Sequence, residues 1–158
     1  MPKRFITLPI LLKPKPPTKR EKRMQKEKTR DAINSALTHL DNSIRALPKN
    51  NDEKAVVNSL WLASSETEYA LFLFSLMQPE KSESPPWKLS SQPKQVVEVG
   101  PALASAQSLL KEAKNNIEAG AIERAYEEAW TARNILLKVQ ELFDKKRKSA
   151  TVQTTWTR

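Results

Sequence analysis

The sequence predicts an all-α protein, an antiparallel four-helix bundle with an extended basic arm at its N-terminus and a short basic tail at its C-terminus. Three observations predict this class. The 158 residues include two glycines and eleven prolines, they are rich in Ala, Leu, Glu and Lys, and apolar residues recur at helical spacing in four stretches. So little glycine leaves few tight β-turns, which disfavours an all-β fold.

The N-terminal arm is predicted to comprise residues 1–18. Five prolines fall within the first seventeen residues, including the run Lys13-Pro14-Lys15-Pro16-Pro17, which favours an extended, polyproline-like chain. The apolar residues 5–12 follow two basic residues, as at the start of a signal peptide. Because this run is short, contains Pro9 and lacks a small-residue cleavage site, we expect no secretion through a signal peptide.

The first helix is predicted over residues 19–47. Thr18 and Glu21 have the spacing of a capping box, and Pro48 stops the helix. Its second half carries an apolar stripe, and the same face is cationic in the first three turns. We therefore expect those turns to project beyond the core. The stripe consists of Ile33, Ala36, Leu37, Leu40, Ile44 and Leu47.

The second helix is predicted over residues 51–78, ending before Pro79. Its apolar residues cover more than one stripe, which is typical of a helix buried on several sides or lying in a subunit interface. An irregular linker, rich in Pro and Ser, follows over residues 79–100.

The third and fourth helices are predicted over residues 101–119 and 121–148, separated by Gly120. In the fourth, apolar residues follow a 3-4-3-4-3-4 spacing, which is typical of a helix-packing seam. They are Ile122, Ala125, Ala129, Ala132, Leu136, Val139 and Phe143. Residues 149–158 are predicted to be a separate tail, in which residues 151–157 are β-prone.

The order of connections, short, long and very short, favours an up-down-up-down bundle, with the basic arm and basic tail at a common end.

The charge is uneven along the chain. Residues 1–30 hold eleven Lys or Arg against two acids, and residues 144–158 hold five against one. Residues 31–143 hold eleven bases and fifteen acids, so the predicted body is acidic.

No enzyme is predicted. The chain has one histidine, His39, no cysteine and no glycine-rich phosphate loop, so we expect no catalytic residue, no metal site and no cofactor or small-molecule substrate. The most apolar helix contains Glu66 and Glu68, so no membrane span is expected.

Two basic ends on an acidic body indicate binding to a polyanion, with phosphate contacts that do not read base sequence. We therefore predict a structural nucleic-acid-binding protein, with DNA favoured over RNA. The candidate phosphate contacts are Lys3, Arg4, Lys13, Lys15, Lys19, Arg20, Lys22, Arg23, Lys26, Lys28, Arg30, Lys145, Lys146, Arg147 and Lys148.

The layout of a basic, proline-containing arm, a cationic helix start over residues 19–30 and a four-helix body resembles the coat proteins of archaeal filamentous DNA viruses. The resemblance implies a nucleocapsid subunit that packages DNA in a virion filament, packed against itself or a related subunit. Under this reading the candidate subunit interface consists of Trp61, Phe72, Phe74 and Trp156.

Two other functions fit the same residues. A ribosome-associated or other ribonucleoprotein accessory protein would use the arm between RNA helices. A helical protein-interaction adaptor would use its alanine-rich hairpin, with the basic ends serving solubility. Either protein is expected in the cytoplasm.

Overall fold

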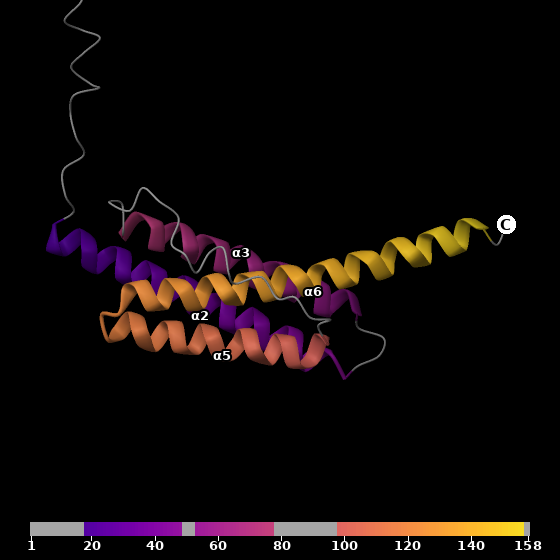
Figure 1. The fold of residues 1–158 in the computed structure, drawn as a ribbon, viewed down its shortest axis with the longest axis horizontal. Helices are drawn as coiled ribbons and strands as arrows, with labels where there is room; N and C mark the ends of the chain where they lie inside the picture. The colour runs from indigo at the N-terminus through magenta and orange to yellow at the C-terminus, as the bar shows by residue number, and fades with distance from the viewer. Residues whose placement is uncertain (1–17, 49–52, 78–97, 157–158) are drawn as a thin grey trace, which may run out of the picture.

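The computed structural model describes residues 18–48, 53–77 and 98–156, with side chains described as far as residue 148. This part of the chain forms four helices and no strand. They are α2 (Lys19–Ala46), α3 (Glu53–Met77), α5 (Val99–Glu118) and α6 (Ile122–Trp156), arranged side by side (Figure 1). The prediction of an all-helical protein with four helices is confirmed.

The four helices form a ring in which each contacts two others. α2 packs against α3 and α5, and α6 packs against α3 and α5, whereas the diagonal pairs do not pack on one another. Contacts between side chains give the directions. Ser43 near the end of α2 donates to the Val56 carbonyl near the start of α3, and Arg30 near the start of α2 pairs with Glu118 at the end of α5. Helices in contact are therefore antiparallel.

The order of directions differs from the expected up-down-up-down arrangement. Along α6, Arg133, Gln140 and Lys146 contact Glu68, Ser64 and Glu53 of α3, so α6 runs against α3 and in the same direction as α2. The order is thus up-down-down-up. α2 begins at one end of the bundle and α6 finishes beyond the other end (Figure 1), so the prediction that the basic ends share a common end is wrong.

The core lies inside the ring and consists of the predicted stripes. The seam of α6 is buried, with all of its alanines fully covered, and small side chains at these positions let α5 approach closely. Phe74 of α3 is fully buried and stacks on Tyr126 of α6, with ring centroids 5.4 Å apart. The stripe of α2 packs into the same core through Ile33, Ala36 and Leu40.

Interactions between residues close in sequence define where two of the helices begin and end. The predicted capping box is confirmed: Thr18 Oγ1 accepts the Glu21 N–H, and the Glu21 carboxylate accepts the Thr18 N–H. Gly120, between α5 and α6, has a φ of 83°, a left-handed conformation that glycine adopts without strain.

Among the described residues, two helices differ from their predicted limits by more than one residue. α5 begins at Val99, not at residue 101. α6 continues to Trp156, so the expected β-prone tail after residue 148 is helical over residues 149–156. This stretch contains neither proline nor glycine, and a single strand would have no partner for its backbone groups, whereas a helix satisfies them internally.

Candidate functional site

The first turns of α2 form a cationic projection. We call residues 19–30 the α2 basic segment; it carries seven Lys or Arg against Glu21 and Glu27. Every residue from 18 to 24 is exposed, so no described helix covers this stretch. Among the described residues, Lys19, Lys22 and Arg23 take part in no ion pair. Their charges are available to a partner.

The inner end of the α2 basic segment is partly used within the molecule. Arg30 Nη1 lies 3.0 Å from Glu118 Oε1 at the C-terminal end of α5. The hydrogen bond from Arg30 lowers the pKa of Glu118, and the nearby charge of Lys26 adds to the effect. Because both partners are substantially exposed, this pair contributes little to stability. Arg30 is therefore a weaker candidate for phosphate contact than Lys19, Lys22 and Arg23.

The second cationic group, which we call the α6 basic run, comprises residues 145–148, and all four are exposed. Lys146 Nζ lies 3.6 Å from Glu53 Oε2 at the start of α3, an exposed and weak pair. The run lies in the part of α6 that leads out of the bundle (Figure 1).

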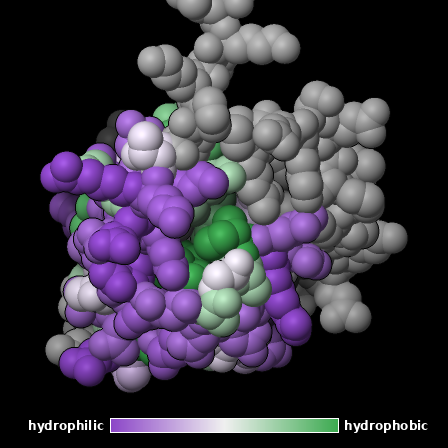
Figure 2. Space-filling view, turned by 90° about the vertical axis from the view of Figure 1, so that its left-hand side faces the viewer, coloured by the Kyte–Doolittle hydropathy of each residue, from purple (hydrophilic) through white to green (hydrophobic). Residues whose placement is uncertain are grey.

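The two cationic groups are far apart. The rise of a helix places Lys19 roughly 16 Å before Arg30, and Lys146 roughly 36 Å after the start of α6. Since Arg30 lies beside the α5–α6 turn, the groups are separated by roughly 50 Å along the bundle. The face at the α2 end is mostly hydrophilic around a small apolar patch (Figure 2). In the part of the chain that the structure describes, the α2 basic segment and the α6 basic run thus form two cationic groups at opposite ends of the bundle.

Other predicted contacts fall outside the described residues. These are Lys3, Arg4, Lys13 and Lys15. Arg20 and Lys28 also lie on α2 and are exposed, and Lys28 lies on the opposite face of the helix from Lys19.

The predicted interface residues separate into two groups. Trp61 and Phe72 are 54 % and 57 % exposed on α3, whereas Phe74 is completely buried against Tyr126. Phe74 is therefore a core residue, and its assignment to a subunit interface is wrong. It lies two residues, about 200°, from Phe72 on the helix. Trp156 ends α6, and its side chain is outside the described part.

Sequence reasoning missed part of the exposed apolar surface. Leu62, Tyr69 and Leu76 of α3 are also about half exposed, and with Trp61 and Phe72 they lie within an arc of about 100°. The arc is opposite the buried face of α3. The available signal was a second 3-4-3-4 series, Leu62, Ser65, Tyr69, Phe72 and Leu76, on the same helix as the core stripe.

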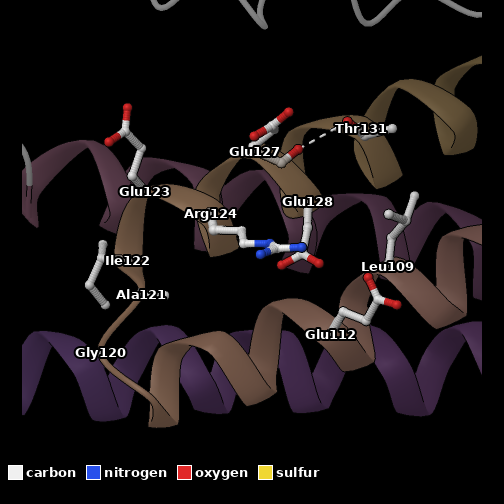
Figure 3. A pocket seen from close by; sticks show the side chains of 10 residues that line it. All are labelled: Leu109, Glu112, Gly120, Ala121, Ile122, Glu123, Arg124, Glu127, Glu128 and Thr131. Atoms are coloured by element: carbon white, nitrogen blue, oxygen red, sulfur yellow. Dashed lines mark hydrogen bonds between the residues drawn. The ribbon is translucent and has the colours of Figure 1, made fainter.

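An acidic groove lies along the α5–α6 hairpin (Figure 3). Glu112, Glu123, Glu127 and Glu128 line it, with one cation, Arg124. Glu128 is buried and accepts a hydrogen bond from Asn116; burial and the adjoining Glu112 raise the pKa of Glu128. Within the described residues no group of three His, Cys, Asp or Glu side chains is placed to hold a metal ion. The groove would repel phosphate, so it is not part of the candidate interface.

Comparisons with known proteins found no matching family model, no similar curated protein and no similar solved structure. The likeness to viral coat proteins therefore stays a prediction. None of the described helices is both long and apolar enough to cross a membrane.

Proposed function

We propose that this chain is a non-enzymatic, structural nucleic-acid-binding protein whose α2 basic segment contacts phosphates without reading base sequence. One observation carries the proposal. The exposed cations Lys19, Lys22 and Arg23 lie on a capped helix start that projects from a body whose own charge is acidic. A charge distribution of this kind attracts a polyanion to the projection and keeps it away from the body.

The opposite placement of the two basic ends changes the expected mode of binding. A subunit with cationic groups roughly 50 Å apart does not hold one phosphate cluster between its ends. It contacts sites about 15 base pairs apart on one duplex, at 3.4 Å per base pair, or it joins two segments of nucleic acid. Both modes suit coating or packaging better than regulation at a single sequence.

A salt titration tests the proposal. For duplex DNA, removing one phosphate contact makes the slope of log affinity against log salt concentration shallower by about 0.9. A variant in which Lys19, Lys22 and Arg23 are all replaced by Gln should therefore bind more weakly, with a slope shallower by about 2.7. Absence of binding by the wild type to both duplex DNA and RNA at low salt would refute the proposal.

A matched control removes the same charge from the body. Arg45, Lys111 and Lys138 lie at the end of α2, on α5 and on α6, away from the α2 basic segment, and their replacement by Gln gives the same net charge. We expect this control to keep the wild-type slope to within about one unit. An equal change of slope in both variants would mean that net charge alone, without a localised interface, determines binding.

The most concrete setting for this function is a coat subunit that packages DNA, as the resemblance implies. Electron microscopy of the purified protein with and without duplex DNA tests it, since a coat subunit should form regular filaments. Co-sedimentation with ribosomes would instead favour a ribonucleoprotein accessory role.

A protein-interaction adaptor is the second candidate, favoured by the exposed apolar face of α3. In that case, removing residues 1–30 should leave partner binding intact, whereas nucleic-acid binding by the proposed interface should be abolished. The two measurements on the same truncated protein separate the functions.

A further inference from the structure

The outward face of α3 is apolar although the opposite face of the same helix already fills the core. We call Trp61, Leu62, Tyr69, Phe72 and Leu76, together with Ser65 between them, the α3 seam. A helix at the surface of a bundle normally carries polar residues on its outer side. Five large apolar side chains on that side, all at least two-fifths exposed, indicate a surface that another molecule covers.

The α3 seam has the pattern of a helix-pairing surface. Leu62, Ser65, Tyr69, Phe72 and Leu76 follow a 3-4-3-4 spacing, and the series extends over about 21 Å. None of the seam's own residues is charged, and the two acids between its first and last leucine, Glu66 and Glu68, lie just outside the two edges of its arc. Of the acids beside it, Glu68 is bound by Arg133 Nε at 2.6 Å within the same molecule. Another helix can therefore pack on the seam without placing a charge in the middle of the contact.

The apolar surface continues onto α6. Leu137, which is also exposed, lies one turn after Arg133 and one turn before Gln140. Those two side chains bond Glu68 and Ser64 of α3, which places Leu137 beside α3.

The size of the surface agrees with a weak or moderate dimer. Three half-exposed aromatic side chains offer roughly 300 Å². The three exposed leucines bring the total to roughly 500–600 Å², the upper end for a single monomer. Two such surfaces facing each other bury roughly 1,000–1,200 Å², which reaches the lower limit for a specific protein interface.

We propose that a second copy of this chain covers the α3 seam, with the two α3 helices antiparallel and a two-fold axis near Tyr69. Tyr69 is the middle member of the 3-4-3-4 series, so an axis there lets the whole series of one copy face that of the other, with Leu62 opposite Leu76. The small side chain of Ser65 of one copy then lies beside the Phe72 ring of the other, which leaves room for that ring in the contact.

The antiparallel arrangement also affects the charged ends. Rotation about an axis perpendicular to α3 brings the α2 basic segment of one copy to the same end as the α6 basic run of the other. Each end of the dimer would thus carry both cationic groups. This consequence for nucleic-acid binding rests on the proposed function, but dimerisation does not.

The first test is the oligomeric state without nucleic acid, so that its outcome is separate from that of the salt titration. Sedimentation velocity over a series of protein concentrations should show a reversible dimer with a dissociation constant in the micromolar range. Phe72→Glu should weaken association on the order of 100-fold, because it buries a charge in the seam. Circular dichroism should show an unchanged fold, since Phe72 is exposed in the monomer.

The second test locates the axis. The chain has no cysteine, so Ser65→Cys introduces a single thiol. The two Ser65 positions then lie roughly 12 Å apart along the helix axes, so a thiol-reactive bismaleimide with a hexane spacer should join two copies through this residue rapidly. Ser108→Cys is the matched control, because Ser108 is also exposed but lies on α5.

A monomer at all concentrations, or crosslinking through Ser65→Cys no faster than through Ser108→Cys, would overturn the proposal. In the first case the α3 seam is covered by a different protein or by residues 78–97 of this chain. In the second case any dimer uses another surface.

Discussion

Two phenylalanines of α3 lie two residues apart and should respond oppositely to truncation. Phe74 is fully buried and stacks on Tyr126, whereas Phe72 is more than half exposed. A Phe→Ala change in a core costs about 3–5 kcal/mol, and removal of the stacked pair places Phe74→Ala in the upper half of that range. Phe72→Ala should cost less than about 0.5 kcal/mol in the monomer.

Urea unfolding followed by far-UV circular dichroism measures the difference. Protein concentration should be kept below that at which a dimer forms, so that only the monomer contributes. The loss for Phe74→Ala, about 4–5 kcal/mol, is a large part of the stability of an ordinary domain, so its urea midpoint should fall steeply. In a thermal scan, a domain of this size should show a melting temperature lower by roughly 12–20 °C. Equal destabilisation of the two variants would mean that α3 is rotated about its axis relative to this structure, and the reasoning about the α3 seam would fail with it.

Three further predictions concern stability. Glu128→Gln should raise the melting temperature at neutral pH and keep the hydrogen bond from Asn116. Burial raises the pKa of Glu128 in the folded state, so its charge destabilises the fold fully at high pH. The gain from the substitution should therefore vanish as the pH falls below the ordinary pKa of a glutamate. Thr18→Ala should destabilise α2 by about 1 kcal/mol, with Thr18→Ser as the conservative control in urea unfolding. Gly120→Ala should cost about 1–2 kcal/mol through its left-handed backbone alone, since no atom lies within 4 Å of the added methyl group; an unchanged urea midpoint would contradict this.

The sequence contained enough information for the buried face of most helices. Hydrophobic periodicity reports which side of a helix is covered, so the stripes of α2 and α6 were predicted correctly. The capping box could also be predicted from the sequence, because it depends on two residues of fixed spacing, Thr18 and Glu21.

The direction of α5 could not be read from the same pattern. Periodicity is unchanged when a helix is reversed, so only the connection before it decides which way it runs. About twenty residues separate Met77 from Val99, enough to return to either end of the bundle. A long connection therefore left two topologies open, and the one chosen from the sequence was wrong.

The exposed surface was also only partly predicted. Trp61 and Phe72 were assigned to an interface together with Phe74 because all three are aromatic residues of one helix. Placing each residue on the helical wheel separates Phe74 from the other two and adds Tyr69. The sequence does not show which of the two apolar faces of α3 points to the core. That depends on where α2 and α6 lie, which the structure supplies.

The position of the basic ends links the two proposals. In one molecule the α2 basic segment and the α6 basic run lie at opposite ends, so a single subunit lacks the combined cationic surface that the sequence suggested. An antiparallel pair through the α3 seam would create that surface twice, once at each end, by symmetry alone. Nucleic-acid binding should then be stronger for the dimer than for Phe72→Glu, although this substitution lies far from either basic group. If Phe72→Glu is monomeric yet binds duplex DNA with the affinity and salt slope of the wild type, the basic ends act independently and dimerisation serves some other purpose.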